Sequence, residues 1–171
     1  IEVNPEEDQQ EMFHYNNVLF KEFYVLPDNY DPLLDVTFDG VHIMNRDIVS
    51  AKPRIVVKLK DESRYLALAD SSLMKLQIRF PGEITPRDYL PGGDTVRFIP
   101  ADLSSNDNTA TIELNPTFPQ DGEYELIASG KDEMGNAAGD LNYRVTFNVI
   151  NKPMISHLLN YPNPFTTSTA F

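Results

Sequence analysis

The sequence predicts an all-β protein, an antiparallel sandwich of about seven short strands. The first observation is a repeated alternation of apolar and polar residues, which is typical of strands with one buried face. The second is that each alternating run is bounded by Pro, Gly, Asn or Asp, as strand ends usually are. The third is that no segment carries a convincing apolar stripe of helical period. The clearest alternating runs are 34–39, 55–60, 75–80, 110–115 and 143–149.

The residues between these runs predict how neighbouring strands are connected. Asp39-Gly40 favours a type I′ turn, so a hairpin is predicted between residues 36–38 and 41–43. Residues 64–75 come nearest to a helical pattern and predict at most one short helical turn. A strand over 124–130, a loop over 131–140 and a strand over 141–150 then form the last hairpin.

Composition limits the classes of function. The chain has 171 residues, 41% of them hydrophobic, which suffices for one domain with extensions. No apolar run approaches the roughly 18 residues of a membrane span, so none is expected. The formal net charge of −12 argues against nucleic-acid binding, which relies on clustered Lys and Arg. Because cysteine is absent, the chain contains no thiol nucleophile, disulfide or thiolate metal site.

Three sections are expected along the chain. Residues 1–30 fit the sandwich poorly and form an N-terminal extension or the remnant of a preceding domain. Their aromatic run is either a strand added to the sandwich edge or the last strand of that preceding domain. The sandwich itself is predicted over 31–152, and residues 153–171 form a linker and a short tail. Since the chain begins with Ile1 and has no leader, it is expected to be an interior piece of a longer protein.

The tail carries the most specific motif of the sequence. It reads Tyr161, Pro162, Asn163, Pro164 and Phe165, followed by a segment rich in Ser and Thr. This resembles the opening strand of the C-terminal sorting domain found in type IX secretion cargo of Bacteroidota, truncated here at Phe171. The resemblance implies an extracellular or outer-cell-surface location, and recognition by the type IX machinery through a complete sorting domain.

A second resemblance rests on Tyr124. It stands two residues before Leu126, which takes the position of the second Cys of immunoglobulin domains, where such a Tyr bonds back to the corner. Residues 122–149 resemble the immunoglobulin-like modules of bacterial surface proteins. With 34–40 and 47–50 they resemble the module before the sorting domain of large Bacteroidota exoproteins. Several of these carry a gingipain-type cysteine peptidase domain upstream. The resemblance implies an immunoglobulin-like sandwich.

Two candidate sites lie in loops. Asp132, Glu133, Asn136 and Asp140 offer oxygen ligands for calcium, although a plain turn around Gly135 is the default interpretation and no other cofactor is expected. Asp94-Thr95-Val96 resembles the O-glycosylation sequon of exported Bacteroidota proteins, which makes Thr95 a candidate acceptor.

The expected function is structural and not enzymatic. The three histidines are dispersed and no nucleophile elbow is present, so no catalytic set is expected. The sequence predicts a spacer that presents the sorting signal and packs against upstream domains of the same polypeptide. One alternative is a glycan- or peptide-binding accessory module. Another is the C-terminal region of a gingipain-type peptidase whose chemistry lies upstream.

Overall fold

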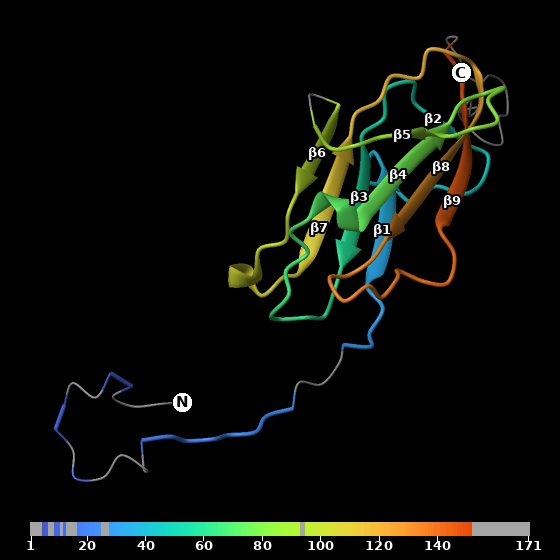
Figure 1. Ribbon diagram of the computed structural model, residues 1–171. Helices are drawn as coiled ribbons and strands as arrows, with labels where there is room; N and C mark the ends of the chain where they lie inside the picture. The colour runs from blue at the N-terminus through green and yellow to red at the C-terminus, as the bar shows by residue number, and fades with distance from the viewer. Residues whose placement is uncertain are drawn as a thin grey trace, which may run out of the picture.

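The structure is a computed structural model and describes residues 5–6, 9–10, 12, 17–24, 28–92 and 95–151. These residues contain nine strands and two short 3-10 helices, arranged as two stacked sheets (Figure 1). The predicted all-β sandwich is therefore confirmed, with two more strands than expected. None of the helices among the described residues has the length and apolar character that crossing a membrane requires.

The first sheet has four antiparallel strands in the order β1-β3-β7-β6. They are β1 (Leu33–Phe38), β3 (Ile55–Lys60), β7 (Thr109–Leu114) and β6 (Val96–Ile99). Lys60 at the end of β3 pairs with Leu33 on one side and Thr109 on the other. The carboxyl end of β3 therefore lies beside the amino ends of β1 and β7.

The second sheet has the order β2-β9-β8-β4-β5. Its strands are β2 (Asp47–Val49), β9 (Tyr143–Val149), β8 (Gly122–Gly130), β4 (Met74–Arg79) and β5 (Arg87–Asp88). β2 pairs with β9 in parallel, and the other pairs are antiparallel, including the predicted last hairpin of β8 and β9. The 3-10 helix η1 (Ser71–Leu73) falls within the segment predicted to hold one helical turn, and η2 (Leu103–Ser105) precedes β7.

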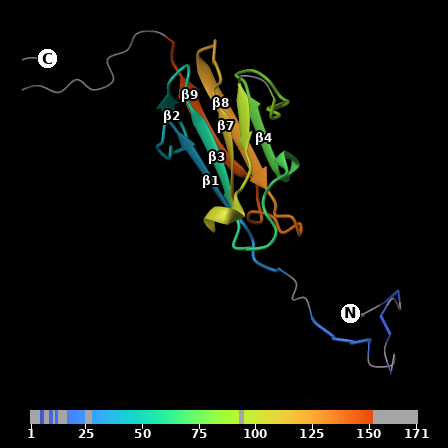
Figure 2. The ribbon, with the colours of Figure 1, turned by 90° about the vertical axis from the view of Figure 1, so that its left-hand side faces the viewer.

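The core lies between the two sheets and follows from the alternation in the sequence. Ile55, Val57 and Leu59 are buried, whereas Lys58 and Lys60 on the same strand are exposed. Each fully buried aliphatic side chain contributes about 1.5–3 kcal/mol relative to an exposed one. Figure 2 shows the strands of both sheets running along the long axis of the molecule.

The predicted hairpin after Asp39-Gly40 is wrong beyond its turn. Both turn residues have positive φ, 50° and 81°, as a type I′ turn requires. Val41 then makes a single bridge to Phe38 and the chain leaves this sheet, since its next strand, β2, belongs to the other sheet. The full length of β1 pairs with β3 instead, which buries Val36 and Phe38.

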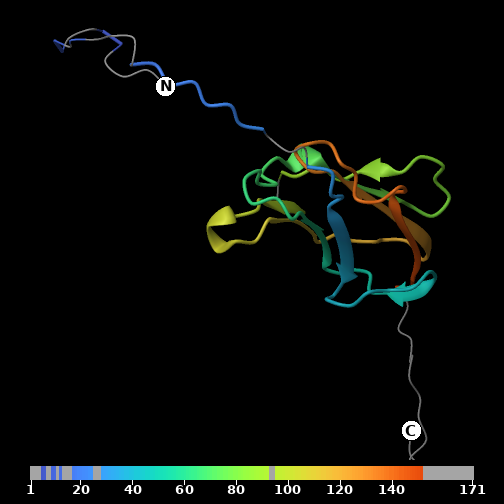
Figure 3. The same ribbon diagram turned by 90° about the horizontal axis from the view of Figure 1, so that it is seen from below.

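The sandwich has two distinct ends. The entry end is where residues 28–32 lead into β1, and it also holds the turns that follow β3 and β8 (Figures 1 and 2). The corner end is where β8 begins and β4 finishes. Residues 17–24 extend away from the entry end, as the view from below shows (Figure 3).

Candidate metal centre

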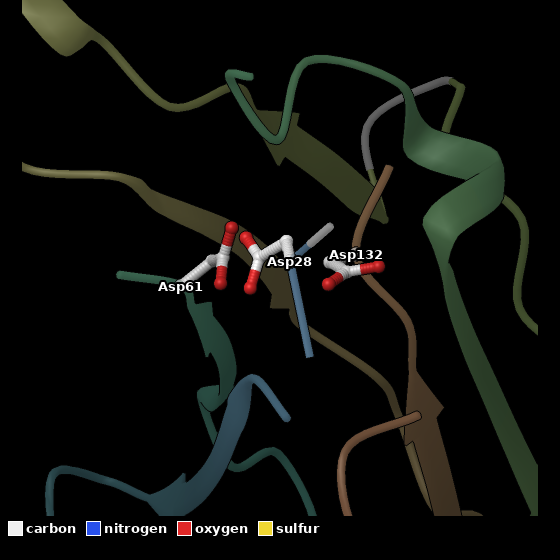
Figure 4. Close-up of side chains that lie close together, drawn as sticks. All are labelled: Asp28, Asp61 and Asp132. Atoms are coloured by element: carbon white, nitrogen blue, oxygen red, sulfur yellow. The ribbon is translucent and has the colours of Figure 1, made fainter. Parts of the chain in front are cut away.

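Three carboxylates from distant parts of the chain meet at the entry end. Asp28 precedes β1, Asp61 directly follows β3, and Asp132 lies two residues after β8. One carboxylate oxygen from each lies within 4.8 Å of the other two (Figure 4). The side chains come from three separate segments, so their proximity is a product of the fold and not of local sequence.

Asp61 is fixed by the end of its strand. Its amide donates to the carbonyl oxygen of Asn108 at 2.9 Å, which continues the β3–β7 ladder by one residue. Its Oδ1 accepts the Glu62 amide at 2.8 Å, and its Oδ2 lies 3.3 Å from Nδ2 of Asn108. The residue is only 6% exposed. The carboxylate is therefore held in one orientation beneath the surface.

Asp132 is fixed by the loop that the sequence singled out. Its Oδ1 accepts the Asn136 amide at 2.8 Å, and its Oδ2 accepts Nδ2 of Asn136 at 2.7 Å. Gly135 has a φ of +95°, which lets the loop turn back within these few residues. Asp132 is 2% exposed. The loop thus closes on the carboxylate and buries it.

Asp28 joins the centre from the N-terminal side. Its Oδ1 accepts the amide of Tyr30 at 3.1 Å, a local turn that orients the carboxylate. Its backbone carbonyl accepts a hydrogen bond from Nδ2 of Asn136 at 3.0 Å. Because Asn136 also binds Asp132, its amide connects the segment before β1 to the loop after β8.

This centre concentrates the negative charge of three carboxylates. Of the ion pairs among the described residues, none involves Asp28, Asp61 or Asp132. Burial raises the pKa of Asp61 above its ordinary value, and the neighbouring charges of Asp28 and Asp132 raise it further. A buried carboxylate without a cation is costly, and removing the partner of a buried charge typically costs about 3–5 kcal/mol.

The geometry fits a hard divalent cation. Calcium takes six to eight oxygen ligands at about 2.3–2.6 Å, so two ligands on opposite sides of one ion are about 4.6–5.2 Å apart. The three oxygens, mutually within 4.8 Å, are close enough to share one ion. Zinc prefers imidazole and thiolate ligands, and neither occurs in this cluster. Magnesium demands a tighter octahedron, which favours calcium for ligands from three separate segments.

The predicted calcium ligands divide into two groups. Asp132 and Asn136 lie at the centre, although the Asn136 amide group acts as a clamp through its hydrogen bonds. Glu133 and Asp140 are exposed and lie outside the group of converging carboxylates. Asp28 and Asp61 were not predicted. Their only sequence signal is position, because Asp61 directly follows β3 and Asp28 lies five residues before β1.

The other predicted sites have separate locations. The Tyr124 hydroxyl donates to the carbonyl oxygen of Gln120 at 3.0 Å, the bond that a tyrosine corner makes. Thr95 is exposed directly before β6, whereas its neighbour Asp94 lies outside the described residues. The sorting motif over 161–165 also lies outside them.

His42 lies in the connection between β1 and β2 and not in the strand that the sequence predicted. Its Nε2 lies 2.6 Å from Oδ1 of Asp35, and both side chains are more than half exposed. An exposed pair of this kind contributes little to stability and provides no enclosed site for acid–base chemistry.

No protein-family model matches the sequence, and the curated proteins include no significant match to it. The function is therefore inferred from the residues and geometry of this chain.

Proposed function

We propose that this chain is a non-catalytic β-sandwich module of an exported protein, and that a calcium ion fixes its N-terminal junction. The ion is held by Asp28, Asp61 and Asp132. One observation carries the proposal: three carboxylates converge, two of them almost fully buried, and none of them forms an ion pair with a cationic side chain in the described part of the chain. A bound cation would offset this electrostatic cost and would cross-link the three segments.

The cross-link would join three segments of the entry end. Asp61 and Asp132 belong to turns of the two opposing sheets, and Asp28 belongs to the segment before β1. Without the ion, the Asn136 amide ties Asp28 to the body through one backbone acceptor. With it, Asp28 gains a charged anchor. Such a junction suits a rigid spacer that transmits orientation along a multidomain polypeptide.

Structural features of the described residues favour a non-catalytic role. The buried carboxylates already accept backbone and amide hydrogen bonds. Among these residues no buried side-chain nitrogen or oxygen lacks a partner. A general acid or base needs a reactive position open to substrate. The arrangement is better suited to holding an ion than to proton transfer.

An exported location agrees with this site. Extracellular calcium modules bind with dissociation constants of about 10⁻⁴–10⁻³ M, a range that a small set of carboxylates supplies. The sorting motif over 161–165 gives an independent reason to propose export by a type IX system. Residues 122–149 also resemble the immunoglobulin-like modules of surface proteins. This likeness supports the proposal that the sandwich is a module of that kind.

The calcium proposal is tested by thermal unfolding after chelation. Calcium at 100 times its dissociation constant should stabilise the chain by about 2.7 kcal/mol and raise the melting temperature by several degrees. Asp28→Asn should abolish the rise, because it removes one ligand charge while its amide oxygen still accepts the Tyr30 amide. Asp140→Asn is the control and should keep the full rise. An equal rise in the Asp28 variant, or none in the wild type, contradicts the proposal.

The export proposal needs a separate experiment. A soluble reporter with a Sec-type signal peptide is fused to the complete sorting domain and expressed in a cell with a working type IX system. The reporter should appear outside the cell, while a fusion ending at Phe171 should stay in the periplasm. Export of the shorter fusion, or retention of the longer one, contradicts this part of the proposal.

A further inference from the structure

The loops of the entry end border a hollow of about 610 Å³ beside the metal centre. Four exposed apolar or aromatic side chains line it: Tyr30, Tyr65, Leu66 and Met134. They come from the segment before β1, the loop after β3 and the loop after β8. The volume falls in the range of about 300–1,000 Å³ that is usual for ligand-binding pockets.

The two tyrosines are prominent in this lining. Tyr30 is 67% exposed and Tyr65 is 89% exposed. The face of a tyrosine ring attracts a cation that lies within about 6 Å of its centroid. The apolar side chains of Leu66 and Met134 can cover the aliphatic stem that carries such a cation in lysine or arginine. The lining therefore suits a side chain with an apolar stem and a cationic head.

The charged groups at the hollow favour the same kind of ligand. Asp28 and Glu62 line it together with the guanidinium of Arg64. A carboxylate oxygen of Asp28 also lies within 4.8 Å of one from Asp61 and one from Asp132. Among the described residues of the lining and the adjoining centre, four carboxylates thus face one cationic side chain. A negative site on a chain with a net charge of −12 attracts cations and repels anions.

We propose that this hollow binds a lysine or arginine side chain of a partner protein, and that calcium in the metal centre weakens this binding. The stem packs on Leu66 and Met134, while the cationic head lies beside the tyrosine rings and the carboxylates of Asp28 and Glu62. The effect of calcium rests on the proposed calcium centre, since a bound ion adds two positive charges next to Asp28. The binding of the side chain itself needs no ion.

The first test is an NMR titration of the chelator-treated chain with Nα-acetyl-lysine N-methylamide and with its arginine counterpart. The amide signals of Tyr65, Leu66 and Met134 should shift in a saturable way. The control ligand is the lysine probe acetylated at Nε, which keeps the stem and loses the charge, and it should bind at least about fivefold more weakly. Saturable binding of only one cationic probe supports the proposal and identifies the side chain. Equal binding of the acetylated control, or no saturable shift with either cationic probe, overturns it.

The second test compares two exposed tyrosines. Tyr65→Ala should weaken binding of the cationic probe by about fivefold, because it removes a ring from the hollow. Tyr24→Ala is the matched control and should leave the affinity unchanged, since Tyr24 is 91% exposed and does not line the hollow. Both side chains are exposed, so neither change should unfold the chain. Equal affinities of the two variants overturn the proposed site.

The third test separates the hollow from the metal centre. Calcium should weaken binding of the lysine probe severalfold in the wild type and in Asp140→Asn, and it should have no effect on the affinity of Asp28→Asn. An undiminished affinity in a wild-type chain whose melting temperature rises with calcium overturns the opposition between the two ligands. If the melting temperature does not rise, the calcium centre fails, and the titration in chelator alone decides whether the hollow binds a cationic side chain.

Discussion

The two ends of the sandwich are closed by different chemistry. At the corner end the rings of Phe80, Phe118, Tyr124 and Phe147 pack on one another with centroids 4.6–6.2 Å apart. At the entry end Asn108, Asp61 and Asp132 are buried among hydrogen bonds. The buried groups of the corner end are aromatic rings, with the exposed Arg87 guanidinium lying 4.0 Å from the centroid of Phe80, whereas the buried groups of the entry end include two carboxylates.

The two ends differ in whether their buried groups carry charge. The aromatic cluster is neutral, and its one buried polar group, the Tyr124 hydroxyl, is satisfied by Gln120. At the entry end the hydrogen bonds of the buried side chains are satisfied, but the three carboxylates form no ion pair with any side chain that the structure describes. We therefore expect stability at the corner end to be indifferent to calcium and stability at the entry end to depend on it.

The largest effect is expected at the corner end. Phe118 is fully buried against three other rings, so Phe118→Ala leaves a cavity and should lower the free energy of unfolding by about 4 kcal/mol. Denaturant unfolding should give the same loss in calcium and in chelator. If the free energy of unfolding falls in only one of the two conditions, the two ends are coupled. That result would contradict the contrast drawn between them.

The next effect belongs to the entry end. The side chain of Asn108 accepts the Leu68 amide and donates to the carbonyl oxygens of Ser63 and Leu66. Asn108→Ala orphans these groups and should cost about 3 kcal/mol. Because Asn108 also contacts Asp61, the calcium-dependent rise in melting temperature should shrink. The exposed Asn115→Ala is the control, and an Asn108 variant with an undiminished rise argues against this coupling.

The smallest effect concerns the corner hydrogen bond. Tyr124→Phe keeps the buried ring and loses the bond to Gln120, so the free energy of unfolding should fall by about 1 kcal/mol. The denaturant midpoint should fall without a change in slope, and the calcium response should be unaltered. If the midpoint does not move, the corner bond makes no net contribution to stability.

The same contrast explains what could be predicted from sequence. Tyr124 and Gln120 are four residues apart, and β8 and β9 adjoin along the chain, so local patterns identify both. Asp28, Asp61 and Asp132 are separated by more than thirty residues at each step, and only the stacking of the sheets brings them together. The path after Gly40 was mispredicted for a related reason. The alternation over 41–43 is typical of a strand, but it does not specify which of the two sheets the chain joins next.

The most direct test of the account is a calorimetric titration of calcium into the chelator-treated chain. We predict one binding site per chain in the wild type and in the Asp140→Asn control, and no binding in Asp28→Asn. Equal binding by all three proteins, or none by the wild type, would contradict a calcium centre built from Asp28, Asp61 and Asp132.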